Sequence, residues 1–409
     1  MPLLRRHIPP RQGTHDLART ATKARNDDQR PGAARAAVPT GQIRPVSWQT
    51  MDRPEARHAW NALALCAAEP NPFHESWYLL PALRALDPKG SAPLLRFEFD
   101  GELAGILPLR REARYYRWPI PQLSNWMHGN CFLGAPLVAA GLERQFWRAL
   151  LAWADAHPRA GLFLHLAQIP LDGPLWSALQ AVLAEQDRLA ALVYREERAL
   201  LASTLSPEAY FEESMSAKKR KELRRQHTRL AELGELTFER RRDDAHLARW
   251  CEDFLALEHS GWKGSAGSAL ASHQATARLF KEALSGAATH GRLERLTLSL
   301  DGEPIAMLVN FLTPPGAFSY KTAFDERYAR FSPGVLIQRE NLLMLSHAEV
   351  RWCDSCAASD HPMIERIWRE KRAVGRVSIA IGGKLRRALF AKVLRAELGY
   401  KPAGLAIEN

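Results

Sequence analysis

The chain has 409 residues, of which 46% are hydrophobic and 25% charged. This composition is typical of a soluble globular protein, and the length predicts two to three domains. The formal net charge is +11, but residues 1–45 and 216–229 carry a net +6 each. The remainder is therefore close to neutral, which argues against a surface that binds nucleic acid along most of the chain.

Five cysteines, an odd number, and a start without a secretory apolar segment predict free thiols in a reducing compartment. No apolar run approaches the roughly 18 residues that a membrane-spanning helix needs. We therefore expect a cytoplasmic protein, and peripheral contact with the inner face of the membrane stays open.

Residues 1–45 are rich in Arg, Ala, Pro and Gly. We expect them to form a disordered basic tail, because they lack the large apolar residues that a core requires. Folded structure is predicted to begin near Ile43, with helices over 54–68 and 77–86. A hairpin is predicted over 93–112, with its turn at the dipeptide Asp100-Gly101, a combination favoured in tight turns.

The second half of the sequence repeats this order. A second hairpin, over 293–312, turns at Asp301-Gly302, and a Glu follows the glycine in both hairpins. A strand and a helix are predicted to follow each hairpin, over 130–138 and 143–156 in the first half and over 317–324 and 333–346 in the second. The pattern predicts an internal duplication, with an N-terminal domain over 46–200 and a C-terminal domain over 201–409.

A basic helix is predicted at the start of the second domain. Residues 218–230 (KKRKELRRQHTRL) contain seven Lys or Arg and one Glu, and Leu223, Leu230 and Leu233 form an apolar stripe that ends before Gly234. The cations suit the phosphates of a cofactor, of a nucleotide-sugar or lipid-phosphate acceptor, of an anionic membrane surface or of tRNA. Aromatic residues for stacking on bases are missing, so DNA is not an expected partner.

The second half resembles the CelD/BcsL-type acetyltransferases, a branch of the GNAT superfamily in which two such domains are often fused in tandem. The resemblance covers residues 216–381, and more weakly 46–200. The residues that carry it are the basic helix, FLALEHSGWKG (254–264), LSLDGEPIAMLV (298–309), SYKTAFDERYARFSPGVLIQ (319–338) and CDSCAASDHPMIERIWREKR (353–372). It implies an α/β (α+β) fold of two tandem GNAT-like domains, each a mixed, largely antiparallel sheet flanked by helices, of which the first is degenerate. The tandem arrangement is also similar to the FemABX aminoacyltransferases, which use aminoacyl-tRNA.

By this resemblance the cofactor is acetyl-CoA or another acyl-CoA, held where two parallel strands separate, with its pyrophosphate at the start of the next helix. Ser332-Pro333-Gly334 suits that place, with an N-cap, a proline in the first turn and a glycine that lets the backbone approach closely. The family pattern is only partly present, since Leu336 occupies its second glycine position, and an ordinary helix start is the alternative. The predicted cofactor-binding residues are Lys321, Arg330, Ser332, Pro333, Gly334, Val335, Leu336 and Gln338.

Acyl transfer from a thioester needs a base for the attacking amine or hydroxyl, and donors for the oxyanion and the departing thiolate. The catalytic candidates are Glu258, His259, Tyr320, Asp325, Asp354 and His361, and the candidate acceptor-binding residues are Trp262 and Lys263. Simpler roles stay open, for His259 as a helix-dipole partner and for Tyr320 as a core residue. Cys353 and Cys356 form a CxxC without a second cysteine pair, so no metal site is expected.

The sequence thus predicts a CoA-dependent N- or O-acyltransferase that works by direct, base-assisted attack. By family association, the acceptor is an amine or hydroxyl of an envelope saccharide or of a lipid-linked molecule. Two alternatives remain: an aminoacyl-tRNA-dependent transferase, and a non-catalytic binding protein derived from the same fold.

Overall fold

The computed structural model describes residues 41–157, 161–400 and 404–407, so the predicted tail lies outside the described residues up to position 40. The N-terminal half contains strands β1 Gln42–Val46, β2 Leu94–Phe99, β3 Glu102–Glu112, β4 Gln122–Asn125, β5 Leu137–Val138, β6 Phe163–Pro170 and β7 Ala190–Leu201, and helices α1 Trp48–Met51, α2 Pro54–Leu65, α3 Ser76–Leu86, α4 Glu143–Ala156 and α5 Gly173–Glu185. The C-terminal half contains strands β8 Leu236–Arg241, β9 Leu293–Leu300, β10 Glu303–Thr313, β11 Gly316–Phe324, β12 Trp352–Asp354, β13 Glu370–Ala380 and β14 Leu405–Ile407, and helices α6 Pro207–Ser214, α7 Ala217–Ala231, α8 Leu247–Ser260, α9 Trp262–Ser265, α10 Gln274–Thr289, α11 Pro333–Asn341 and α12 Lys384–Leu398.

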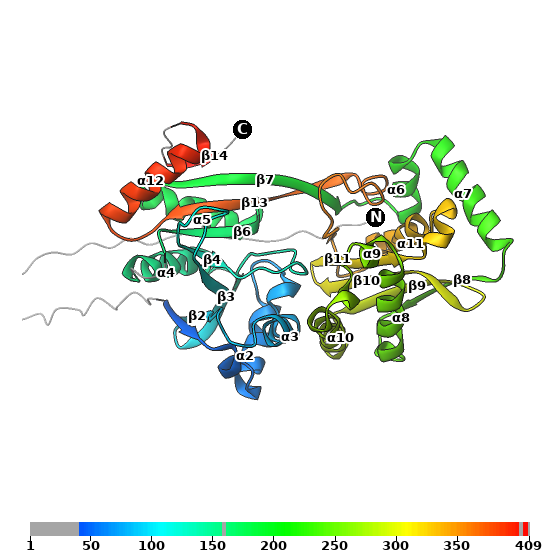
Figure 1. Cartoon of the computed structure of the whole chain (residues 1–409), viewed down its shortest axis with the longest axis horizontal. Helices are drawn as coiled ribbons and strands as arrows, with labels where there is room; N and C mark the ends of the chain where they lie inside the picture. The colour runs from blue at the N-terminus through cyan, green and yellow to red at the C-terminus, as the bar shows by residue number, and fades with distance from the viewer. Residues whose placement is uncertain (1–40, 158–160, 401–403, 408–409) are drawn as a thin grey trace, which may run out of the picture. The chain divides into compact units, whose positions relative to one another are not determined.

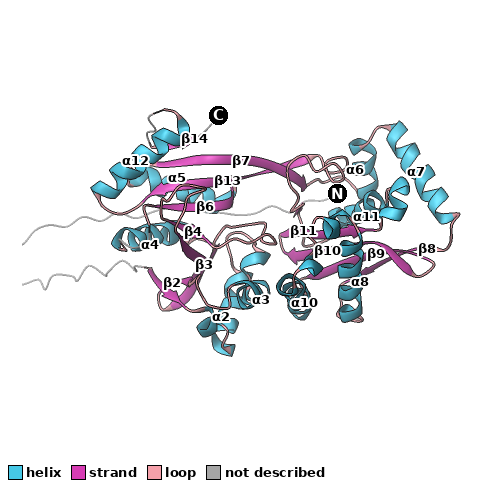
Figure 2. Ribbon diagram, in the orientation of Figure 1, coloured by secondary structure: helices cyan, strands magenta, loops and turns pink. Residues whose placement is uncertain are grey.

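The two halves repeat one order of strand pairing (Figure 1). In the first half β1, β2, β3 and β4 pair antiparallel in chain order, and β4 pairs parallel with β6. In the second half β8, β9, β10 and β11 do the same, and β11 pairs parallel with β12. Helices flank the strands in both halves (Figure 2). The repetition confirms the predicted fold class, a mixed and mostly antiparallel α/β architecture in two copies.

The two halves exchange strands. β13, from the C-terminal part of the chain, lies between β6 and β7 and is antiparallel to both. β7 in turn reaches the other half, where Leu200 and Leu201 pair with Asp354 and Cys353 of β12. Figure 1 shows β7 and β13 running side by side from one half to the other. The domain boundary near residue 200 stays a prediction, since residues 370–380 complete the sheet of the first half.

Both predicted hairpins are confirmed, with the predicted turn chemistry. Asp100 and Gly101 have φ values of 52° and 85°, and Asp301 and Gly302 have values of 51° and 81°. Two successive left-handed residues are the central pair of a type I′ turn, where Asp-Gly is favoured because glycine bears no Cβ. The chain therefore reverses direction within two residues at both hairpins.

The predicted strand over 130–138 is wrong in extent. The strand after the first hairpin is β4, which comes earlier, and only Leu137–Val138 of the predicted range is a strand. A Cβ on Gly134 would lie 2.1 Å from the carbonyl oxygen of Ala167, so the chain passes close over β6 there. The segment forms a loop that reaches toward the C-terminal half, and this loop contributes Phe132 to the site described below.

The hydrophobic core crosses from one half to the other. α3 packs against α10, where a Cβ on Gly286 would lie 2.9 Å from the carbonyl oxygen of Trp77, so the approach requires glycine. The rings of Trp77 and Phe311 lie 4.9 Å apart, edge to face. Since residues of both halves belong to one buried cluster, we expect the halves to unfold together.

α7 is the predicted basic helix, and it is amphipathic as predicted. Leu223 and Leu230 are buried, whereas Leu233 lies beyond the end of the helix and is half exposed. None of the described helices combines the length and the apolar character that crossing a membrane requires.

Candidate active site

A cavity of about 760 Å³ lies where β11 and β12 part. The two strands pair over only three residues each, from Gly316 and Trp352 onward. Directly afterwards β11 has a β-bulge, since Val309 pairs with Lys321 and Asn310 with Ser319, which leaves Tyr320 as the extra residue. A bulge bends a strand and redirects its side chains, and bulges are frequent beside active sites. The cavity walls come from β11, the start of α11, residues 355–366, α9 and the N-terminal-half loop with Phe132.

The cavity wall carries positive charge and unpaired polar atoms. Lys263, Lys321 and Arg366 line it, and no Asp or Glu does so in the part of the chain that the structure describes. Ser319 Oγ and His361 Nδ1 are buried on the same wall without a hydrogen-bond partner among the described residues. Because buried polar atoms are nearly always paired in folded proteins, this combination indicates a site for a polar, anionic ligand.

Lys321 is a buried cation of the cavity wall that no described carboxylate neutralises. Its Nζ lies 5.1 Å from the centre of the Phe132 ring and 5.6 Å from that of Tyr320, and it forms no ion pair with any described carboxylate. Burial, together with the neighbouring Lys263, lowers the pKa of Lys321 to about 8, although Glu258 opposes the shift. A lysine with a lowered pKa in a cavity is a candidate for function.

Lys263, by contrast, is neutralised. Its Nζ donates to Glu258 Oε1 at 2.9 Å, and the other oxygen of Glu258 accepts from the backbone N–H of Leu270 at 2.8 Å. Glu258 is buried behind the cavity wall and does not line the main cavity. The structure therefore favours Glu258 as the residue that positions Lys263, and its predicted role as a base stays a prediction.

His361 is the predicted base that the structure places best. It lines the cavity with an unpaired, buried Nδ1. Burial and the positive charge of Lys263 lower the pKa of His361 below its usual value, so its imidazole is neutral at neutral pH. A neutral imidazole in a cavity wall is able to accept a proton.

The start of α11 differs from its prediction in two respects. Ser332 occupies the N-cap position, but in a left-handed conformation with φ 56°, and its side chain makes no capping hydrogen bond. The Ser332 carbonyl oxygen accepts from the backbone N–H groups of Val335 and Leu336 at 2.9 and 3.0 Å. Since Pro333 has no N–H, the N–H of Gly334 is the first-turn donor without an acceptor among the described residues. A Cβ on Gly334 would lie 2.4 Å from Sδ of Met363, so the Met363 side chain rests on the predicted cofactor seat.

Tyr320 lines the cavity, but its hydroxyl is directed away from it. The Tyr320 hydroxyl lies 3.1 Å from the Tyr78 hydroxyl, which donates to the carbonyl oxygen of Asn130. The ring is almost completely buried and stacks on Phe311 at 4.6 Å. Burial raises the pKa of Tyr320 above its ordinary value. This geometry supports the alternative of a core residue, and proton donation to a thiolate stays a prediction.

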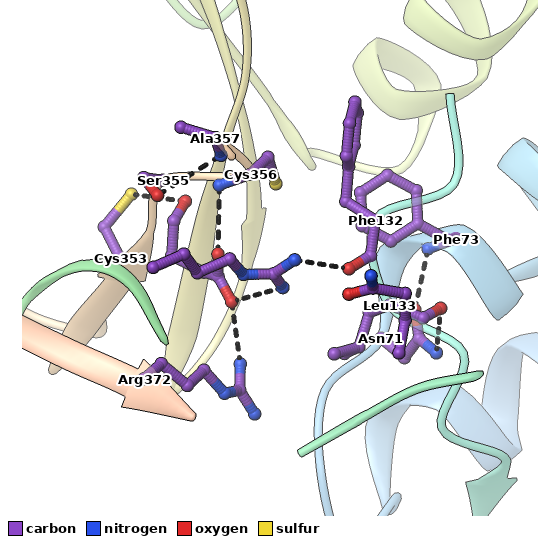
Figure 3. Close-up of polar contacts among 12 residues, drawn as sticks. Asn71, Phe73, Phe132, Leu133, Cys353, Ser355, Cys356, Ala357 and Arg372 are labelled. Carbon is purple, nitrogen blue, oxygen red and sulfur yellow. Dashed lines mark hydrogen bonds and ion pairs between the residues drawn. The ribbon is translucent and has the colours of Figure 1, made fainter. Parts of the chain in front are cut away.

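Asp354 lies in a buried ion-pair network and does not line the cavity. Its partners Arg372 and Cys356 are labelled in Figure 3. Its Oδ2 accepts from Arg198 at 2.7 Å and from Arg372 at 3.2 Å, and Oδ1 accepts from the backbone N–H of Cys356 at 3.0 Å. Arg198 also donates to the carbonyl oxygen of Phe132 at 2.7 Å. Asp354 therefore fixes two segments of the cavity wall, one from each half of the chain.

The predicted site residues, taken together, separate into two groups. Those that line the cavity are Trp262, Lys263, Tyr320, Lys321, Ser332, Gly334, Val335, Gln338 and His361. Those outside the lining are Glu258, His259, Asp325, Arg330, Pro333, Leu336 and Asp354. Asp325 is held by Arg327 at 2.6 Å, and His259 is exposed. Local sequence signals did not point to Ser319, Phe132, Met363 or Arg366, which reach the cavity through the bulge and the loops.

Comparisons with known proteins identify a domain family in the C-terminal half. Residues 217–362 match the acetyltransferase (GNAT) domain family. The C-terminal half therefore contains a GNAT acetyltransferase-like domain. The matched segment begins with α7 and ends just after His361, so it includes most of the cavity wall. The finer CelD/BcsL membership stays a prediction, and a search of curated protein sequences finds no match.

Solved structures with a similar fold share little sequence with the chain. FemX is 10% identical with a TM-score of 0.51, over 81% of this chain and 98% of FemX. The C-terminal domain of a protein described as a lysylphosphatidylglycerol synthetase, from Agrobacterium fabrum, is 14% identical with a TM-score of 0.49, over 83% and 96%. A tandem GNAT protein from the clavulanic acid biosynthesis pathway is 16% identical with a TM-score of 0.42, over 84% and 100%. The likeness to FemX bears on the fold alone.

Proposed function

We propose that the protein is a GNAT-type acyltransferase that takes an acyl group from acyl-CoA to an amine or hydroxyl acceptor in the β11–β12 cavity. The observation that carries the proposal is the cavity itself. It lies in the GNAT-like domain, Lys321, His361 and Ser319 line it, and no described carboxylate does so. Cations without anions on the wall suit a donor that carries phosphates.

Each of these residues has a distinct role in the proposed acyl transfer. Gly334 offers its free N–H, at the positive end of α11, to a phosphate group of the donor. The donor supplies an activated thioester carbonyl. His361 accepts the proton of the acceptor, and the charges of Lys321 and Lys263 favour the negative charge that develops on the oxyanion and the leaving thiolate. The same charges lower the pKa of an acceptor amine and so favour its reactive, neutral form.

Gly334→Ala is expected to weaken acetyl-CoA binding at least about tenfold, equivalent to about 1.4 kcal/mol, because the added Cβ occupies the seat and presses on Met363. Calorimetric titration of acetyl-CoA into the full-length protein measures the affinity. Gly383→Ala is the matched control, since Gly383 also lies at the start of a helix, as the N-cap of α12, but has open space around its Cβ position. Equal affinity of Gly334→Ala and the wild type would remove the start of α11 from the proposal.

A second candidate, an aminoacyl-tRNA-dependent transferase, is favoured by one surface. Lys218, Lys219, Lys221, Arg224 and Arg229 of α7 are exposed, and among the described residues none of them has an ion-pair partner. An array of this kind suits a polyanion. Under this candidate, charge reversal at Lys218 and Lys221 abolishes binding of aminoacyl-tRNA in a filter assay, whereas acetyl-CoA does not bind. The envelope saccharide or lipid-linked acceptor and the cytoplasmic location also stay predictions.

A further inference from the structure

Lys321 has no ion-pair partner among the described residues. Lys263, on the same cavity wall, is neutralised by Glu258 at 2.9 Å, whereas the Lys321 ammonium group lies over the faces of the Phe132 and Tyr320 rings. Ring faces compensate only part of the cost of burying an ammonium group. The protein thus maintains an amine in the cavity at some cost in stability, and such a group is a candidate for chemistry.

The surroundings of Lys321 favour its neutral, nucleophilic form. The described ionisable groups that interact with its charge are Lys263, Glu258, Cys356 and His128. Burial and Lys263 outweigh Glu258 and Cys356 and lower the pKa to about 8. Near pH 7.5 the neutral fraction is then on the order of 10² times that of an ordinary lysine. Lysines activated by desolvation and by a neighbouring cation are known nucleophiles toward carbonyl carbon.

We propose that Lys321 is a self-acylation site, which takes the acyl group from the bound donor when no acceptor is present. The inference rests on the proposed function, because it needs an acyl thioester in the cavity. The Nζ atom attacks the thioester carbonyl, a C–N bond forms and the C–S bond breaks. The leaving thiolate takes up the proton that Nζ loses, so the products are an acyl-lysine and a free thiol. The modification removes the charge of Lys321 from the cavity and thereby weakens the site for an anionic donor.

The test uses the full-length protein with acetyl-CoA and no acceptor at pH 8, followed by intact mass and peptide mapping. The wild type is expected to gain one acetyl group at Lys321, at least about tenfold faster than the exposed lysines of α7. Lys321→Arg keeps the charge and is expected to lose this gain. Lys281→Arg is the matched control, because Lys281 is an ion-paired, exposed lysine outside the cavity, and it is expected to behave like the wild type.

The outcomes separate this inference from the proposed function. Calorimetric binding of acetyl-CoA without acetylation of Lys321 overturns self-acylation and leaves the acyltransferase intact. Acetylation at Lys321 no faster than at the lysines of α7 also overturns it, since this is the background of an unselective reagent. Absence of acetyl-CoA binding removes both proposals together.

Discussion

Replacement of Asp354 by asparagine is expected to lower the free energy of unfolding by about 3–5 kcal/mol. It leaves the buried Arg198 guanidinium without its anion, and Arg372 with only the exposed Asp172 at 4.0 Å. Arg198 and Arg372 both donate to Asp354 Oδ2, and all three side chains are almost completely buried. Urea-induced unfolding, followed by circular dichroism, measures the change. The result also decides how a loss of activity in this variant is interpreted, since Asp354 positions the cavity wall and does not line it.

Asp325→Asn is the matched control for Asp354→Asn, because its partner Arg327 is 83% exposed, and it is expected to cost about 1 kcal/mol or less. The pH dependence has a definite sign. Burial disfavours the charged form of Asp354, but Arg198 and Arg372 outweigh it and lower the pKa. A depressed pKa stabilises the fold above the unfolded value, near 3.9, and this stabilisation is lost as pH falls through the folded pKa. Equal stability of both variants would contradict the role of the network.

The His361→Gln variant is expected to lower kcat by about 10²-fold, since glutamine has a similar size but cannot accept the proton of the acceptor. The rate of CoA release from acetyl-CoA in the presence of an amine acceptor measures the effect. Because the pKa of His361 is lowered from its usual 6.5, the wild-type rate is expected to fall only below pH 6.5, where His361 takes up a proton. The variant is expected to show no such decrease in acid.

His347→Gln is the matched control for His361→Gln. The pKa of His347 is also lowered by burial, but His347 lies outside the cavity lining, so its replacement is expected to change the rate by less than about twofold. A His361→Gln enzyme with the wild-type rate and an unchanged decrease in acid would show that another group takes the proton.

Local chemistry explains the parts of the fold that the sequence predicts well. Both Asp-Gly turns are predictable because positive φ at two successive residues selects those residue types. The helix at 143–156 and the start of α11 at Pro333 follow from apolar periodicity and from the proline rule for first turns. Lys321, Gly334 and His361 were candidates through the resemblance to the acetyltransferases, whose carrying segments contain all three residues.

Contacts between residues far apart in the chain explain what the sequence does not predict. β13 lies between β6 and β7, a pairing that no local pattern encodes. Asp354 resembles a cleft carboxylate in sequence, but Arg198 reaches it from the other half of the chain. Ser332 resembles an N-cap, but the chain enters α11 with a left-handed residue, so its hydroxyl does not face the helix N–H groups. In each case tertiary packing overrides a local preference.

The most direct test of the central claim is a crystal structure of the protein with CoA. We expect the pyrophosphate at the N–H of Gly334, the thiol end in the cavity between β11 and β12 near Lys321 and His361, and a displaced Met363 side chain. CoA bound elsewhere, or an empty cavity at millimolar CoA, would contradict the proposal that this cavity holds the acyl donor.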